Sequence, residues 1–315
     1  NYNVVVGDEA GTALTTGDQN VAIGFEALAT EDTRGGSTAL GYRALKAQNG
    51  DTANTHNVAI GADAGLSLST GNRNVYVGAL SGDANTTGDG NTAVGHNTLS
   101  TNTHSENNVA VGYEALKTFN VGSGSGYNTA VGSVAGTALT TGIQNTLIGG
   151  QAGDALTDAD FNVALGYSAL GAAITSDGNT AIGRFALLSD TQGNLNVAVG
   201  RDALRAQNMG SDIDSYNVAV GGLAGTALTT GVENTFIGGL AGDALTDADY
   251  NVVVGKSALS ADTLGSGSTA IGYAALNNQN FTTATTSQNT AVGYYAGVSI
   301  TTGVRNTIMG GLSGD

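Results

Sequence analysis

The sequence predicts an all-β fold, a parallel β-solenoid of about 18 stacked coils built on a 17-residue repeat. Three observations predict it. One phrase, roughly Asn-(Thr/Val)-Ala-(Val/Ile)-Gly-x-x-Ala-(Leu/Gly), occurs eighteen times, and thirteen of the seventeen spacings between its copies are identical, at seventeen residues. The apolar residues of each phrase alternate and stop at Gly, so the helical period of about 3.6 residues does not survive. A fixed short period marks a solenoid, in which each repeat is buried only by its neighbours.

The phrase begins with Asn in sixteen coils and with Ser in two. We number the coils 1 to 18 in chain order, and we count positions within each coil from this first residue. The first residues are Asn3, Asn20, Ser37, Asn57, Asn74, Asn91, Asn108, Asn128, Asn145, Asn162, Asn179, Asn196, Asn217, Asn234, Asn251, Ser268, Asn289 and Asn306.

Positions 2 to 4 are rich in β-branched residues and predict a short strand. Side chains alternate along a strand, so positions 2 and 4 point to one face and positions 1 and 3 to the other. The sequence leaves open which face is the core. If positions 2 and 4 fill it, position 3, which is Ala in twelve coils, forms an apolar strip suited to close approach of another copy. Either way the strand is apolar on both faces, which predicts a second buried surface.

Position 5 is Gly in every coil, which indicates a turn with positive φ or a close approach of backbone. Positions 8 and 9, Ala followed by Leu or Gly, predict a second short strand. The remaining Thr, Gly, Asp and Asn residues are typical of loops. Stacking would align the first-position Asn residues into a ladder of side-chain amides that hydrogen-bond between coils.

Four coils are longer than the others, by three or four residues each. Their extra residues lie in 46–56, 117–127, 205–216 and 277–288, and Asn49, Asn120, Asn208 and Asn280 share one offset. Every coil must close at the same length to keep register, so we expect the insertions to protrude as loops from one edge. Neither terminus resembles the polar cap of a solenoid. We therefore interpret residues 1–315 as a single continuous array, a window of a longer fibre protein or a subunit whose ends other copies cover.

The composition excludes several classes of function. The formal net charge is −16, and the ten Lys and Arg residues are scattered along the sequence, which disfavours nucleic acid and anionic membranes as partners. The sequence has no Cys, so disulfides and thiolate metal sites are excluded. No apolar run approaches the length that a membrane span needs, roughly 18 residues, so membrane insertion is not expected.

The repeat resembles two related groups of surface proteins. One is the head repeat of trimeric autotransporter adhesins. The other is the 17-residue repeat of large bacterial surface proteins and phage tail fibres, Asn-Thr-Ala-Val-Gly-Tyr-x-Ala-Leu, which the coils from Asn91, Asn108, Asn162 and Ser268 follow closely. The resemblance covers the whole chain. It implies a left-handed β-roll, a homotrimer around one axis, and an extracellular or cell-surface location, or a phage tail fibre.

No residue is predicted to be catalytic, to bind a cofactor or to bind a metal, and we expect no enzyme activity and no cofactor. His56, His96 and His104 are interpreted as surface residues. Asp154, Asp158 and Asp160 recur as Asp243, Asp247 and Asp249. They could hold Ca²⁺, but the calcium-binding Gly-Gly-x-Gly-x-Asp repeat is absent, and solvated turns with Asx hydrogen bonds are the preferred interpretation.

The expected function is a structural, non-catalytic filament or adhesin shaft that associates with itself and attaches to a host or environmental surface. The alternative is a glycan-binding or ice-binding solenoid module. Aromatic residues precede position 1 or follow the turn Gly, where they could stack on glycans or cover the coil corners: Tyr2, Tyr127, Phe161, Tyr216, Tyr250, Phe25, Tyr42, Tyr113, Tyr167, Tyr273 and Tyr294. Ice binding would need a flat, regular array of Thr, and position 2 is Val in nine coils.

Overall fold

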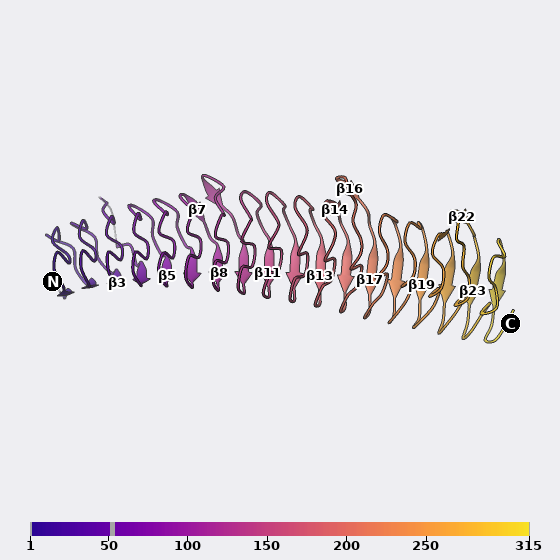
Figure 1. Cartoon of the computed structure of the whole chain (residues 1–315). Coiled ribbons are helices and arrows are strands. Elements are labelled where there is room, and N and C mark those ends of the chain that lie inside the picture. Colours follow the sequence, from indigo (N-terminus) through magenta and orange to yellow (C-terminus); the bar gives the residue numbers. More distant parts are fainter. Residues whose placement is uncertain (1, 51–53, 315) are drawn as a thin grey trace. The chain divides into compact units, whose positions relative to one another are not determined.

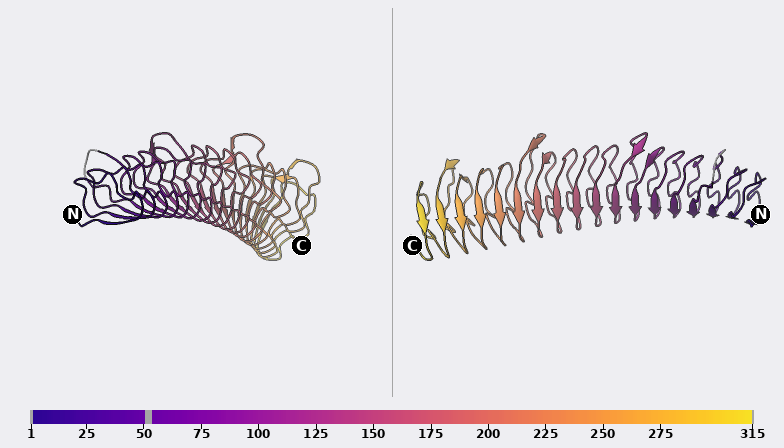
Figure 2. Two further views of the ribbon diagram at one scale, coloured as in Figure 1. Left: turned by 60° about the vertical axis from the view of Figure 1, so that its left-hand side comes forward. Right: turned by 180° about the vertical axis from the view of Figure 1, so that it is seen from behind.

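The computed structural model describes residues 2–50 and 54–314. It divides into two compact units, Asn1–Asp160 and Phe161–Asp315. Each unit is a parallel β-solenoid of nine coils, drawn in Figures 1 and 2. In the described part of the chain every regular element is a strand, so the all-β prediction is confirmed.

Each coil contributes one three-residue strand at positions 2 to 4, as predicted. In the first unit these are β1 (Val4–Val6), β2 (Val21–Ile23), β3 (Thr38–Leu40), β4 (Val58–Ile60), β5 (Val75–Val77), β6 (Thr92–Val94), β8 (Val109–Val111), β10 (Thr129–Val131) and β11 (Thr146–Ile148). In the second unit they are β12 (Val163–Leu165), β13 (Thr180–Ile182), β15 (Val197–Val199), β17 (Val218–Val220), β18 (Thr235–Ile237), β19 (Val252–Val254), β21 (Thr269–Ile271), β23 (Thr290–Val292) and β24 (Thr307–Met309).

Successive strands within a unit pair in parallel with equivalent positions aligned. Val4 pairs with Val21 in the first unit, and Thr180 pairs with Val197 in the second. The register holds across the longer coils, since Val109 pairs with Thr129 and Val197 pairs with Val218. The prediction that each coil stacks directly on the next is therefore confirmed within each unit.

The core contains position 3. Its Ala side chains are fully buried in all twelve coils that carry Ala there, and so are Phe236 and Leu147, which replace Ala. Positions 2 and 4 point outward and are half-buried or exposed. The idea of an Ala strip that contacts another copy is therefore wrong, because the coil's own interior covers that face.

The segment after the strand is a turn, which corrects the prediction of a second short strand at positions 8 and 9. Position 9 has left-handed backbone in every coil, whether it is Gly65 (φ 58°) or Leu45 (φ 49°). Position 7 is left-handed as well. A Leu with positive φ is sterically uncommon, so the sequence predicts an extended conformation at this position.

The Gly at position 5 meets both of the requirements that the sequence suggested. Gly183 has φ 133°, and a Cβ atom built on it would lie 2.5 Å from the carbonyl oxygen of Gly200 in the next coil. No other residue fits a column in which successive turns stack this closely.

The Asn ladder is confirmed, and in most coils the side-chain amide has two distinct roles. The backbone N–H of Asn234 donates to Oδ1 of Asn217 (2.9 Å), and that of Asn251 donates to Oδ1 of Asn234 (3.0 Å). Meanwhile Nδ2 of Asn234 donates to the carbonyl of Ala248 at position 15 of its own coil (2.7 Å). Asn234 therefore links two coils through its oxygen and closes one coil through its nitrogen, and most other ladder Asn residues do the same. In the longer coils that begin at Asn108 and Asn196, Nδ2 donates instead to Oδ1 of the preceding Asn (3.1 Å in both).

Coils with Gly at position 9 and coils with Leu at position 9 fill their cores differently. Leu170 and Leu204 project into the core beside small Ala residues at position 3. Where position 9 is Gly, a large residue at position 3 of the same or the following coil takes that space. Cβ atoms built on Gly225 and Gly242 would both lie 2.6 Å from the ring of Phe236. The alternation of Leu and Gly along the chain is thus a matter of core volume.

The insertions protrude from one edge of each unit, but they also form additional strand pairs. β9 (Gly124–Ser125) pairs with β7 (Ser105–Glu106), β16 (Ile213–Asp214) pairs with β14 (Gly193–Asn194), and β22 (Thr285–Thr286) pairs with β20 (Gly265–Ser266). These short strands lie at the upper edge in Figure 1. The expectation of plain loops is therefore wrong for these three insertions. Residues 51–53 of the first insertion lie outside the described residues.

A buried polar network replaces the apolar core where three of the insertions begin. In the third insertion, Nε2 of Gln207 donates to the carboxylate of Asp190 in the preceding coil (2.7 Å). Nδ2 of Asn217, in the following coil, donates to Oε1 of Gln207 (3.1 Å). The same three-member arrangement occurs for Glu31, Gln48 and Asn57 and for Asp262, Gln279 and Asn289.

Candidate binding face

The outward face of each unit consists of the side chains at positions 2 and 4 of the strands. Position 4 is aliphatic in every coil except the last, where it is Met309, and position 2 is Val or Thr. Inner coils still expose a large share of these residues, including 38% of Val220 and 41% of Ile237. A parallel sheet normally has both faces covered, so a sheet with one apolar face open to solvent is unusual.

Exposed aromatic residues flank the outward face on both sides. On the side before position 1, Tyr127, Phe161, Tyr216 and Tyr250 are exposed, with Tyr216 and Tyr250 carrying φ values of 48° and 61°. On the other side, at position 6, Phe25, Tyr42, Tyr113, Tyr167, Tyr273 and Tyr294 are exposed. The sequence-predicted aromatic residues therefore lie at the coil corners, where they remain accessible to a partner.

The aromatic residues at position 6 cluster on coils with Leu at position 9 and on the coils next to them. We call these clusters corners A to D. Corner A contains Phe25 and Tyr42, whose ring centroids are 5.6 Å apart, with the Arg43 guanidinium 4.8 Å from the Tyr42 ring. Its charges are balanced, because Arg43 pairs with Asp63 (2.8 Å) and Lys46 with Glu26 (2.6 Å).

Corner B is also balanced. His96 stacks on Tyr113 with centroids 5.8 Å apart, and Lys117 pairs with Glu114 at 3.0 Å. That hydrogen bond from Lys117 lowers the pKa of the Glu114 carboxyl below its ordinary value.

Corner D is aromatic. Tyr273 lies 5.5 Å from Tyr294 and 5.2 Å from Tyr295 between ring centroids. The hydrogen bond between Tyr295 and Tyr273 raises the pKa of the Tyr295 hydroxyl above its ordinary value.

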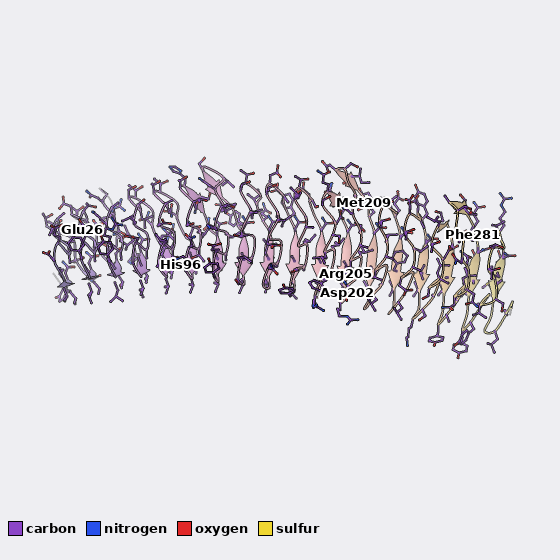
Figure 3. The ribbon with its side chains drawn as sticks, in the orientation of Figure 1. Glu26, His96, Asp202, Arg205, Met209 and Phe281 are labelled. Carbon is purple, nitrogen blue, oxygen red and sulfur yellow. The ribbon has the colours of Figure 1, made fainter. Side chains whose placement is uncertain are left out.

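Corner C differs from the other corners because it carries an excess of positive charge. Tyr167 and Phe185 meet edge to face with centroids 5.6 Å apart, and the guanidinium groups of Arg184 and Arg205 lie 4.0 and 5.2 Å from the Phe185 ring. Asp202 contacts Arg201 at 3.3 Å and Arg205 at 3.5 Å. Figure 3 shows Asp202 and Arg205 at the lower edge and Met209, from the same coil, at the upper edge. Three of the basic residues that are scattered along the sequence therefore come together at this corner.

The three His residues do not form a joint site. Nδ1 of His104 is 2.7 Å from Oγ1 of the adjacent Thr103, His96 belongs to corner B, and His56 lies in the first unit next to Gly36 of the preceding coil. Among residues 2–50 and 54–314, no group of three or more His, Cys, Asp or Glu side chains is placed to hold a metal ion.

The recurring Asp residues act mainly between coils. Oδ1 of Asp160 accepts the backbone N–H of Ile143 (2.7 Å), and Oδ1 of Asp249 accepts that of Val232 (2.9 Å). Oδ1 of Asp247 accepts the hydroxyl of Thr230 at 2.7 Å. Burial raises the pKa of the Asp154 carboxyl. These hydrogen bonds tie one loop to the next, so they act between coils and are not the local Asx hydrogen bonds that the sequence predicts.

The loop Thr residues also bond along the stack. The hydroxyl of Thr229 donates to the carbonyl of Thr246 (3.0 Å), and that of Thr246 donates to the carbonyl of Thr263 (3.0 Å). On the outward face, Thr at position 2 never continues beyond three successive coils, the longest run being Thr269, Thr290 and Thr307. Neither column forms the long, unbroken Thr array that the ice-binding hypothesis requires.

No protein-family profile matches the chain, and no curated protein matches it. The 17-residue period of the structure is consistent with the resemblance noted above without identifying a family. In the described part of the chain no helix is long and apolar enough to cross a membrane.

Proposed function

We propose that this protein is a structural, non-catalytic filament or adhesin shaft that assembles with copies of itself through the outward face. The observation that carries the proposal is the half-exposed apolar ladder at positions 2 and 4, bordered by exposed aromatic residues. Large apolar surfaces on soluble proteins mark interaction sites, and a surface that recurs in every coil suits a partner with the same repeat.

A closed cyclic trimer would cover the ladder most simply. Three equivalent copies around one axis would bury every outward face and leave no sheet surface open. The resemblance to trimeric adhesins supports this number of copies, and it also supports an extracellular or cell-surface location or a place in a phage tail fibre. The corners on either side of the ladder would remain near the rim, available to a host or environmental surface.

Multi-angle light scattering of the purified chain tests the proposal. We expect an oligomer at micromolar concentration, and we expect Val220→Asp and Ile237→Asp to dissociate it. These side chains are paired neighbours on the outward face, so a carboxylate on them would be buried without a partner in the oligomer and solvated in the monomer. The substitution Thr302→Asp on an exposed loop is the matched control. A wild-type chain that is a stable monomer would overturn the proposal.

Substitutions at position 3 do not test this interface. Ala130 and Ala219 are fully buried within the coil, so Asp at either residue would unfold the solenoid rather than separate the copies. The outward neighbours of Ala219 in the same strand are the informative residues.

A further inference from the structure

Corner C carries more positive charge than its own acidic residue can balance. It contains the guanidinium groups of Arg184, Arg201 and Arg205 and the single carboxylate of Asp202. All three Arg side chains are exposed, and in the described residues Arg184 has no acidic side chain within ion-pairing distance. This local excess of positive charge occurs in a chain whose formal net charge is −16.

The aromatic rings hold the cations in place. Phe185 carries the guanidinium of Arg184 at 4.0 Å and that of Arg205 at 5.2 Å, and Tyr167 contacts the Phe185 ring edge to face. Asp202 is almost fully buried, and its Oδ1 accepts no hydrogen bond, since the nearest cation, Nη1 of Arg205, is 3.5 Å away. Arg184 and Arg205 are therefore oriented mainly by ring contacts, whereas Arg201 is placed by Asp202 at 3.3 Å. The exposed guanidinium groups still have N–H groups available to an incoming anion.

We propose that corner C binds the carboxylate of a uronate-bearing glycan. Guanidinium groups match carboxylates in a bidentate geometry. The exposed ring of Tyr167 offers an apolar face to the C–H groups of the sugar ring that bears the carboxylate.

The charge of the whole chain decides against denser polyanions. Nucleic acid carries a negative charge about every 1.7 Å and would be repelled by a chain whose formal net charge is −16. A uronate oligosaccharide carries one carboxylate per sugar ring, which is fewer charges per unit length than nucleic acid, so it meets this local cluster with a smaller penalty. The site uses no residue of the outward face, so it is independent of self-assembly.

The test is calorimetric titration of the full chain at low ionic strength with oligogalacturonate and, separately, with the same oligosaccharide after reduction of its carboxyl groups. We expect saturable binding of the uronate and none of the reduced form. Arg184→Gln and Arg201→Gln should each weaken binding by about tenfold, as expected for loss of one charge-assisted hydrogen bond. Arg43→Gln is the matched control, because Arg43 also stacks on an aromatic ring but is balanced by Asp63.

The inference would be overturned by no saturable binding of the uronate, by equal binding of the reduced oligosaccharide, or by equal weakening by Arg43→Gln. Equal affinity for an oligo-glutamate peptide would also overturn it, because the corner would then select charge alone. Light scattering on the same samples separates this site from the proposed assembly, since Arg184→Gln should leave the oligomeric state unchanged.

Discussion

The exchange of core volume between positions 3 and 9 can be measured by converting one coil to the other type. Coil 14 holds Phe236 at position 3 and Gly242 at position 9, whereas coil 10 holds Ala164 and Leu170. Phe236→Ala alone should lower the free energy of unfolding by about 3–5 kcal/mol, since it leaves a cavity in a fully buried site.

Gly242→Leu alone should also destabilise coil 14. A Cβ atom at residue 242 would lie 2.6 Å from Cε1 of Phe236, so the new side chain overpacks the core, at a cost of about 1–3 kcal/mol. The backbone contributes less to this cost, because nine other coils hold Leu with positive φ at this position. In the double variant the Leu side chain enters the space that the ring leaves. We therefore expect the combined loss to fall short of the sum by roughly 2 kcal/mol.

Long repeat arrays need not unfold in one step, so the local free energy is best read from hydrogen exchange of ladder amides. The N–H of Thr235, which donates to the carbonyl of Asn251 at 2.8 Å, reports on coil 14. Phe236→Ala combined with Gly239→Ala is the additive control, because the nearest atom to a Cβ at Gly239 is 3.8 Å away. Coupling below about 0.5 kcal/mol between Phe236→Ala and Gly242→Leu would refute the volume exchange.

Three further outcomes follow from the structure. Asn234→Ala should lower the local free energy of unfolding by about 3 kcal/mol, because the Asn251 N–H and the Ala248 carbonyl lose their buried partner. Hydrogen exchange measures this loss. A loss no greater than that caused by Thr230→Ala would contradict the prediction. Gly183→Ala should prevent stable stacking, whereas Gly239→Ala should leave stability unchanged. Thermal unfolding followed by circular dichroism measures both. Equal melting temperatures of the two variants would contradict the role of position 5. Burial raises the pKa of the Asp83 carboxyl above its ordinary value of 3.8. Protonation of Asp83 therefore favours the folded state, and this contribution to stability is lost as the pH rises from 3.8 through the raised pKa. Asp83→Asn should therefore be more stable than wild type in urea unfolding at neutral pH, and the difference should shrink below pH 3.8; a difference independent of pH would contradict it.

The 17-residue period was sufficient to predict the strands, the turn Gly and the Asn ladder, because each depends on contacts that recur in every coil. The direction of the strand faces was not predictable from alternation, since both faces are apolar. A signal was nevertheless present. Tyr76, Leu147, Phe236 and Ile308 replace Ala at position 3 only in coils whose position 9 is Gly. Such paired changes in volume indicate two residues that share one interior, and they identify position 3 as the core.

The corners were harder to predict because their residues are spread over several coils. Tyr167, Arg184 and Arg201 are each one repeat apart, so they share position 6 on three successive coils. Aligning the coils would have placed them in one column. Their ring contacts would still have been missed, since Phe185 belongs to position 7 and reaches its partners only through left-handed backbone (φ 61°).

Core type and surface chemistry vary together along each unit. Most coils with Leu at position 9 carry a small or polar residue at position 12, with Phe119 as the exception. Three of these polar residues, Glu31, Asp190 and Asp262, begin the networks that fix the insertions. The aromatic and charged corners gather on these coils and their neighbours, at the edge opposite to the insertion, as Figure 3 shows for Arg205 and Met209 of coil 12. The coils with Gly at position 9 between the corners carry small residues at position 6, including Ala62, Ala79, Gly222 and Gly239. The alternation of Leu and Gly at position 9 every few coils therefore determines which coils carry bulky or charged side chains at the corner and which carry small ones. Packing of the core therefore fixes the intervals at which the corners occur along each unit.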